Sequence, residues 1–277
     1  MPSFKITHQE FEPPEELKDT IRCFWYESRD SKELQSDFEV MPDGYAEIIF
    51  YFGSLSSTGY NEGIEPLPSP FIMGLLNQPA ILTTQNRLEI IGIRCFPWTI
   101  FDLLGLPSGK DGMRIIEHPI ARLQTLLTSR IKKGNINDAI TQVTAYFLTA
   151  RSGIATDSLL FKAGAAMNEA NGKIPVSEVA AAAHATIRTL ERKFKQSSGY
   201  SVKDVSGLMR FEQVRNQLWH YPDSSLAALA HELGYTDQSH LSREFKRYSG
   251  TTPAAFSRNT KKRKQDIEND FVAFVQS

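Results

Sequence analysis

Thr186-Ile-Arg-Thr-Leu-Glu-Arg-Lys-Phe-Lys-Gln-Ser-Ser-Gly199 recurs 51 positions later as Asp237-Gln-Ser-His-Leu-Ser-Arg-Glu-Phe-Lys-Arg-Tyr-Ser-Gly250. The two stretches are identical at their Leu, Arg, Phe, second Lys, last Ser and Gly positions. Each follows a small apolar segment, at 176–184 and at 226–234, so each copy predicts a helix, a short turn and a second helix. That shape is a helix-turn-helix, and the chain is expected to contain two of them.

The residues around the repeat have helical patterns as well. Gly, Asn and Pro residues separate the apolar segments at the places where helices are expected to end. An all-helical domain is therefore expected over 159–258, with helices at 159–169, 176–183, 187–196, 202–220, 226–233 and 238–248. A basic stretch at 261–264 begins a tail, 259–277, whose apolar residues recur at helical spacing, namely Ile267, Phe271, Phe274 and Val275.

Charge divides the chain into two unlike parts. The whole chain has a net charge of -1, but residues 1–159 hold 14 Lys and Arg against 20 Asp and Glu, whereas residues 160–277 hold 17 against 12. A basic half suggests a polyanionic partner for that half alone. The start of the chain has no apolar leader, and no stretch is long and apolar enough to span a membrane, so a soluble cytoplasmic protein is expected. Cys23 and Cys95 have no metal-binding spacing and are expected to be buried, inert thiols.

Residues 1–116 have the pattern of strands and turns. Short segments rich in β-branched and aromatic residues are bounded by Pro, Gly, Asn and Asp, at 21–26, 46–52, 71–75, 80–84 and 88–96. Several short strands of this kind favour a β-barrel or sandwich. The expected fold class is therefore α+β and multidomain, with a β-rich barrel-like domain followed by an all-α domain.

Residues 117–150 predict a pair of helices, and 151–158 a linker rich in small polar residues. The first helix has an apolar stripe at Ile120, Leu123, Leu127 and Ile131. This stripe either packs against the barrel or forms a homodimer interface, and the sequence does not decide between the two.

The exposed faces of the repeated helices have the side chains that DNA recognition requires. Leu190 and Phe194, and likewise Leu241 and Phe245, are four residues apart and are expected to face the core. The opposite faces present groups that match base edges in the major groove, since Arg pairs with guanine, Gln with adenine and Glu with cytosine. The expected base-facing residues are Arg188, Glu191, Arg192, Gln238, Ser239, His240, Ser242 and Arg243. Donors expected to bind phosphate are Thr186, Lys193, Lys195, Lys246 and Arg247.

Residues 187–195 and 230–256 closely resemble the DNA-binding domain of the AraC/XylS transcription regulators. The resemblance covers about 100 residues. It implies seven helices, with two helix-turn-helix units bridged by the long helix 202–220, and two recognition helices that enter successive major-groove segments about 34 Å apart. It also implies double-stranded DNA and RNA polymerase as partners. Two departures concern the first unit, because His184 replaces the glycine found at Gly234 and because Glu191 is acidic in a position that faces a polyanion.

The front half resembles, less specifically, the cupin-like sensor domain of a subgroup of these regulators. The resemblance rests on segments such as Met41-Pro-Asp-Gly44 and Gly92-Ile-Arg-Cys-Phe-Pro-Trp98. It implies a small-molecule effector, and five aromatic residues are candidates for lining its pocket: Trp25, Tyr45, Phe50, Phe52 and Trp98. At least three of them are expected to be ordinary barrel core.

Two other functions compete with ligand-controlled DNA binding. The front half could instead serve only dimerisation or partner contact in a regulator without an effector. A cupin-type enzyme is a more distant alternative, because a catalytic metal needs several His ligands and residues 1–159 contain only His8 and His118. No cofactor, no metal and no enzymatic activity are expected, while the effector, the operator and the choice between activation and repression stay open.

Overall fold

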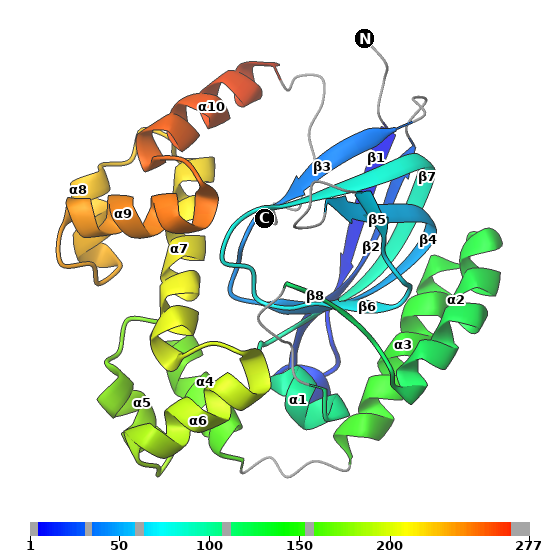
Figure 1. Ribbon diagram of the computed structural model, residues 1–277, viewed down its shortest axis with the longest axis horizontal. Coiled ribbons are helices and arrows are strands. Elements are labelled where there is room, and N and C mark those ends of the chain that lie inside the picture. Colours follow the sequence, from blue (N-terminus) through cyan, green and yellow to red (C-terminus); the bar gives the residue numbers. More distant parts are fainter. Residues whose placement is uncertain (1–4, 31–34, 59–63, 107–111, 153–157, 267–277) are drawn as a thin grey trace.

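The computed structural model describes residues 5–30, 35–58, 64–106, 112–152 and 158–266. Within these ranges a β-rich domain is followed by a helical domain, which confirms the fold class expected from the sequence (Figure 1). The middle of the predicted linker and the apolar residues of the predicted tail, from Ile267 onward, lie outside the described residues.

The front domain is built on one antiparallel sheet of eight described strands that curls round on itself (Figure 1). Its main order is β1-β2-β7-β4-β6-β8, while β3 pairs with β7 and β5 pairs with β4. The strands are β1 (Lys5–Phe11), β2 (Ile21–Asp30), β3 (Ser36–Val40), β4 (Ala46–Thr58), β5 (Ile64–Pro66), β6 (Phe71–Met73), β7 (Ala80–Cys95) and β8 (Met113–Ile115).

The central strands β2, β4 and β7 are largely buried on both faces, which explains the apolar runs in their sequences. On β2, Phe24 packs on one side and Trp25 on the other, because side chains alternate along a strand. Trp25 lies across Gly92 of β7, where an added Cβ would be 2.0 Å from the indole. Glycine is therefore required at position 92 by this close approach.

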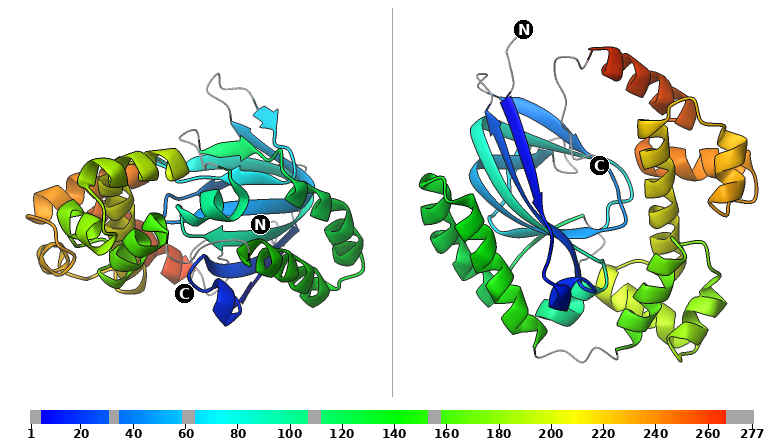
Figure 2. Two further views of the ribbon diagram at one scale, coloured as in Figure 1. Left: turned by 90° about the horizontal axis from the view of Figure 1, so that it is seen from below. Right: turned by 180° about the vertical axis from the view of Figure 1, so that it is seen from behind.

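The helical pair of residues 117–150 covers the outer face of the sheet. Helices α2 (Leu123–Lys132) and α3 (Ile136–Arg151) lie along one side of the barrel (Figure 2). Leu127 and Ile131 are buried there in the same cluster as Phe24. The apolar stripe thus packs against the sheet, so it is not an exposed face for dimerisation.

Strand assignments from the sequence were incomplete in two ways. The two strands expected at 80–84 and 88–96 form the single strand β7, in which Asn86 takes a positive φ of 59° and lets the chain bend without breaking. Strands β1, β3, β5 and β8 were not expected, because they are short or carry polar residues that a period-two pattern does not reveal.

The second domain has seven helices within the described part of residues 159–266. They are α4 (Leu159–Glu169), α5 (Val176–Ala182), α6 (Ile187–Ser198), α7 (Val202–His220), α8 (Leu226–Glu232), α9 (Gln238–Ser249) and α10 (Pro253–Asp266). The α5–α6 and α8–α9 pairs lie toward opposite ends of α7 (Figure 1). Helix α10 continues beyond residue 258, where a tail was expected, because its Lys- and Arg-rich sequence favours a helix.

The two domains touch near helix α1 (Thr99–Leu104). The Trp98 ring, just before α1, lies 5.9 Å from the Phe194 ring of α6 and covers Gly164 of α4. Ser158, at the start of α4, donates a hydrogen bond of 3.1 Å to Asp102 of α1. The Ser158–Asp102 hydrogen bond and the Trp98–Phe194 aromatic pair thus join the barrel to the first helix-turn-helix unit.

Two further expectations concern the cysteines and membrane spans. Cys23 and Cys95 are free and buried as expected, and burial raises the pKa of the Cys23 thiol to about 12. None of the helices formed by the described residues is both long and apolar enough to cross a membrane.

Candidate nucleic-acid interface

Both recognition helices are amphipathic and capped at each end. Thr186 accepts a hydrogen bond from the backbone N–H of Thr189, and Asp237 accepts one from His240, so each helix begins at a side-chain cap. Gly199 and Gly250 end α6 and α9 in the left-handed conformation, with φ of 81° and 71°. The repeat in the sequence is therefore a repeat of the same helix with the same caps.

The inner faces of α6 and α9 pack as the spacing predicted. Leu190, Phe194 and Leu241 are fully buried, and the exposed fraction of Phe245 is 1%. All four belong to one apolar cluster that also includes Phe211 of α7. The side chains on the opposite faces are consequently directed away from the core.

The two turns before these helices have the same backbone conformation despite different residues. Gly234 has a φ of 72°, and His184 at the matching position has a φ of 50°. Ala185 donates to the Ala180 carbonyl and Tyr235 to the Ala230 carbonyl, each at 2.9 Å. The first turn therefore keeps the left-handed geometry without glycine, at the steric cost of a Cβ.

Most of the residues expected to face bases are accessible. Arg188 and Arg192 are exposed on α6, and Gln238, Ser239 and Arg243 are exposed on α9, while Ser242 is half-buried. Together they form two outward rows of donors and acceptors, one on each recognition helix.

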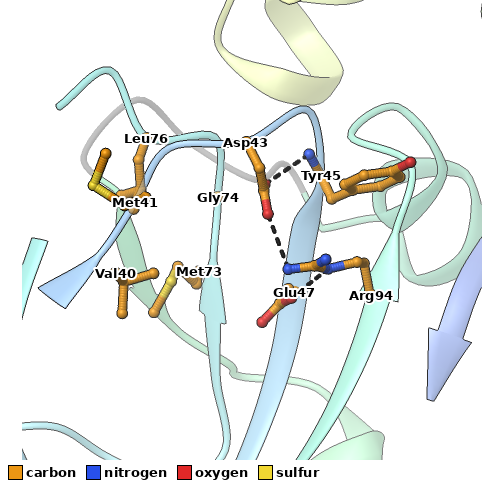
Figure 3. A pocket seen from close by; sticks show the side chains of 9 residues that line it. All are labelled: Val40, Met41, Asp43, Tyr45, Glu47, Met73, Gly74, Leu76 and Arg94. Carbon is orange, nitrogen blue, oxygen red and sulfur yellow. Dashed lines mark hydrogen bonds and ion pairs between the residues drawn. The ribbon is translucent and has the colours of Figure 1, made fainter. Parts of the chain in front are cut away.

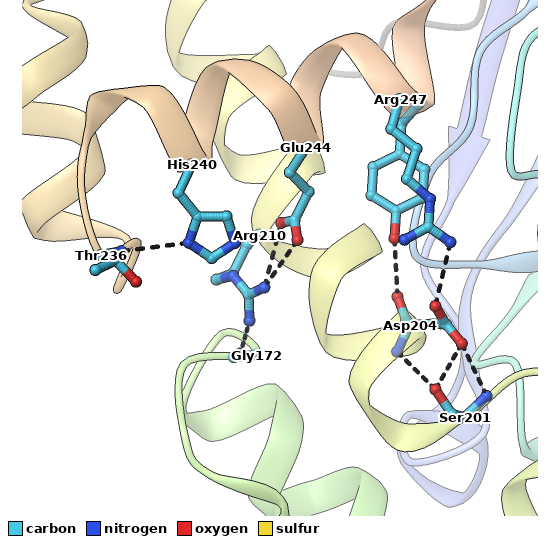
Figure 4. Close-up of polar contacts among 9 residues, drawn as sticks. Gly172, Ser201, Asp204, Arg210, Thr236, His240, Glu244 and Arg247 are labelled. Carbon is cyan, nitrogen blue, oxygen red and sulfur yellow. Dashed lines mark hydrogen bonds and ion pairs between the residues drawn. The ribbon is translucent and has the colours of Figure 1, made fainter.

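Glu191 and His240 are held by local partners. The Glu191 carboxylate accepts a hydrogen bond of 3.4 Å from the backbone N–H of Val202, at the start of α7. In α9, Nδ1 of His240 accepts one of 3.4 Å from the Thr236 backbone (Figure 4). The acidic Glu191 thus has a structural partner. Its place at the start of α7 is favourable, because the N-terminal end of a helix attracts negative charge.

The donors expected to bind phosphate differ in their exposure and in the contacts that they make. Lys195 and Lys246 are exposed, whereas Thr186 is exposed but already serves as the cap of α6. Lys193 lies near Asp102 of α1, where burial raises the pKa of the carboxyl and the Ser158 hydrogen bond and the Lys193 charge offset part of that rise. Arg247 forms an ion pair of 3.3 Å with Asp204 of α7 (Figure 4).

Arg210 of α7 joins the two helix-turn-helix units and was not singled out from the sequence. It donates to the Gly172 carbonyl at 3.0 Å and to both Glu244 carboxylate oxygens at 3.2 Å (Figure 4). Its guanidinium also lies over the Tyr235 ring, 5.2 Å from the centroid. Gly172 precedes α5 and Glu244 belongs to α9, so one side chain fixes the first unit relative to the second.

Ile187 is a second residue that the sequence reasoning missed. It begins α6 and is 50% exposed, although its spacing from Leu190 and Phe194 suggests a core position. The 51-residue shift of the repeat aligns it with Gln238, which was assigned to base contact. An apolar side chain does not suggest hydrogen bonding, so the alignment with Gln238 is the one sequence signal that points to this residue.

The five aromatic residues expected to line an effector pocket do not come together. Trp25 lies inside the barrel, Phe50 and Phe52 pack on the opposite face of the sheet, and Trp98 packs against the helical domain. The reason is the two-residue period of strands, which sends neighbouring positions to opposite faces. Tyr45 lines a pocket at the end of the barrel near α7 (Figure 3), and Trp98 lines a separate one with Phe96 and Phe161.

The two histidines of the front domain have separate partners. His8 on β1 contacts Glu27 at 3.3 Å, and His118 accepts a hydrogen bond from the Ile120 backbone just before α2. Among the described residues, no group of three or more His, Cys, Asp or Glu side chains is placed to hold a metal ion.

Comparisons with known proteins agree with this domain organisation. Residues 179–259 match a helix-turn-helix domain family, and residues 9–111 match a domain family of unknown function. The HTH-type transcriptional regulator RipA of Corynebacterium glutamicum is 36% identical over 70 residues, which are 25% of this chain and 20% of that protein. RipA of Corynebacterium diphtheriae is 30% identical over 83 residues, 30% of this chain and 24% of that protein. The matches thus span less than a quarter of these relatives.

Solved structures include similar chains. The DNA-binding domain of AdpA, in complex with a target DNA, is 25% identical and matches 39% of this chain and 97% of that one, with a TM-score of 0.36. ToxT from Vibrio cholerae O395 is 10% identical and matches 92% of this chain and 97% of that one, with a TM-score of 0.43.

Two helix-turn-helix units on one bridging helix define the second domain as a tandem helix-turn-helix domain of the DNA-binding class. The helix-turn-helix match over 179–259 agrees with the resemblance of this domain to the DNA-binding domain of the AraC/XylS regulators.

Proposed function

We propose that the protein is a sequence-specific, DNA-binding regulator of transcription. The observation that supports this most is the pair of matching capped helices, α6 and α9, with exposed arginines on faces opposite one shared core. In the proposed complex each helix enters a major-groove segment on the same side of the duplex.

The side chains have distinct proposed roles. Arg188, Arg192 and Arg243 donate to guanine, and Gln238 pairs with adenine. Ser239, Ser242 and His240 contact bases at the edge of the same row. Glu191 orients α7 and thereby the first unit. Lys195 and Lys246 bind phosphate, which gives affinity and salt dependence without sequence preference.

An effector is proposed to act in the front domain, at the pocket near Tyr45. Its lining combines the charged residues Asp43, Glu47 and Arg94 with apolar side chains of Val40, Met41, Met73 and Leu76 (Figure 3). An apolar wall with a few polar groups is the usual composition of a small-molecule site. The same DNA-binding domain would also serve a regulator without an effector, or one acting as a homodimer or with RNA polymerase.

The DNA-binding proposal is tested by comparing Arg243→Ala with Lys246→Ala. Operators are first selected from random duplexes with the full chain, and binding is then measured by fluorescence anisotropy on selected and scrambled DNA. Arg243→Ala is expected to cost about 1–3 kcal/mol on the selected sequence only, because a bidentate guanine contact is lost. Lys246→Ala is expected to weaken binding to both sequences alike and to reduce the salt slope by about 1. Selection of no sequence above background contradicts the proposal.

A further inference from the structure

The loop between β3 and β4 connects the barrel to the bridging helix α7. Arg215 of α7 donates a hydrogen bond of 3.0 Å to the Pro42 carbonyl, and the Gly44 backbone N–H donates to the Glu212 carboxylate. We call these two hydrogen bonds the α7 clasp. They place a barrel loop against the bridging helix of the DNA-binding domain.

Asp43, which lies between Pro42 and Gly44, points away from α7 and toward Arg94. The Asp43 carboxylate accepts a hydrogen bond of 2.9 Å from Nη2 of Arg94, whose Nε donates to Glu47 at 2.7 Å (Figure 3). Arg94 and Glu47 are 4% and 6% exposed. Consecutive residues of one short loop thus hold α7 on one side and an ion cluster of the barrel on the other.

The clasp works together with the aromatic contact at the other end of the interface. Trp98 packs on Phe194 and Gly164, and Asp102 is near Lys193 of α6. The barrel is therefore attached at two points, one beside a recognition helix and one in the second half of α7. Among the described residues, releasing the clasp would leave the attachment at Trp98 and the apolar contacts of Met41 and Leu75 with the helical cluster.

The net charges of the two domains determine whether releasing the clasp strengthens or weakens DNA binding. Residues 1–159 have a net charge of -6, and the clasp holds this acidic part next to a helical domain that must approach a polyanion. Like charges within about 10 Å repel measurably at moderate salt. Freedom of the barrel to move away would therefore lower the electrostatic cost of binding DNA.

We propose that the α7 clasp is an autoinhibitory contact, which rests on the proposed DNA-binding function. The clasped arrangement binds DNA more weakly than the released one. The proposed effector pocket shares Asp43 and Tyr45 with this loop, so an occupant acts on α7 through the position of Asp43.

A reversible crosslink tests the clasp in the full chain. A Cβ added at Gly44 would lie 3.7 Å from Cα and 3.3 Å from Cγ of Met209, so the double variant Gly44→Cys, Met209→Cys brings two thiols within disulfide reach. The native Cys23 and Cys95 do not compete, because burial raises the pKa of both thiols and keeps them protonated. Oxidation locks the clasp, and a reductant opens the lock in the same sample.

DNA affinity is measured before and after reduction, at low and at high salt. We expect the oxidised protein to bind its selected operator about fivefold or more weakly than the reduced protein. This ratio is expected to approach one as the salt concentration rises, because screening removes the repulsion. Each single variant serves as a control without a redox response.

Other results overturn the proposal. Failure of the disulfide to form shows that the loop and α7 are not held together, and equal or tighter binding when locked shows that the clasp is not inhibitory. The uncharged substitution Gly44→Leu gives a second test. Its side chain must displace Met209 or the loop, and it changes no charge. It is expected to raise affinity at low salt. If the wild-type chain selects no operator, the failure belongs to the proposed function and not to the clasp.

Discussion

Two residues of the first helix-turn-helix unit differ in type from what their positions in the domain favour. His184 and Gly234 have the same left-handed backbone at matching positions, and Glu191 accepts a hydrogen bond at the start of α7 instead of facing outward alone. Both departures noted in the sequence of the first unit are therefore tolerated by the fold. The first costs backbone strain and the second has a local partner.

Exchanging the turn residues is expected to change stability in opposite directions. Gly234→Ala should destabilise by about 1 kcal/mol, because a Cβ in this conformation is strained although its nearest neighbour, Lys173, is at an ordinary contact distance of 3.6 Å. His184→Gly should stabilise by about 0.5 kcal/mol, since relief of strain exceeds the entropy of an added glycine. Urea unfolding measures both. A destabilised His184→Gly would show that the imidazole contributes more than the strain costs.

Ile187 is expected to contact the methyl group of a thymine. The methyl group is the apolar feature of the major groove, and the half-exposed Ile187 is aligned with Gln238 in the proposed base-facing row. Replacing each operator thymine in turn by deoxyuridine should weaken wild-type binding at one position, by about 1 kcal/mol for the lost methyl burial. Ile187→Ala should be insensitive to that replacement. Equal sensitivity of both proteins would remove Ile187 from the interface.

At the scale of elements, helices were easier to predict than strands. The bounds of α4 and α7 agree with the sequence expectation, and those of α5, α6, α8 and α9 differ by one or two residues, because caps and a period of 3.6 are local signals. Strand β1 was missed because its sequence, Lys-Ile-Thr-His-Gln-Glu-Phe, has few apolar residues. It is an edge strand, held by β2 and by polar contacts of its histidine.

The β1 contacts predict a pH-dependent stability. Burial lowers the pKa of His8, but hydrogen bonds to Glu10 and Glu27 and their charges raise it more, to about 9. A pKa raised above the unfolded value of 6.5 gives stability that is complete below pH 6.5 and is lost as pH rises through 9. His8→Gln should therefore cost about 1 kcal/mol at pH 6, after allowance for solvent screening, and little at pH 9.5. Urea unfolding at both pH values measures this, with exposed His231→Gln as the control; an equal cost at both values contradicts it.

At the scale of the whole molecule, the two domains are joined by a few specific contacts. The aromatic pair of Trp98 and Phe194 lies at one end and the α7 clasp at the other. Trp98 was predicted as a pocket residue, and its position between domains followed from no local pattern. Such contacts depend on how two separately folded parts meet.

Gly164→Ala tests the aromatic end of this interface. An added Cβ would be 2.1 Å from the Trp98 indole, so either α4 or the tryptophan must move. We expect a net loss of about 1–3 kcal/mol from overpacking, despite the better helix propensity of alanine. Calorimetry should show a lower or split melting transition, while the exposed control Ala165→Ser should melt like the wild type. An unchanged transition would mean that the domains do not rely on this contact.

The sequence by itself determined the tandem helix-turn-helix domain, its core pairs and its outward arginines, because helical spacing, caps and an internal repeat are written within short stretches. It also indicated a β-rich front domain, without its full set of strands. Only the tertiary structure decided which face of the sheet each aromatic residue occupies, that Arg210 ties the two units together, and that the Pro42–Gly44 loop holds α7. Those contacts join residues 34 to 173 positions apart, so their geometry depends on strand pairing and domain packing that no local pattern encodes.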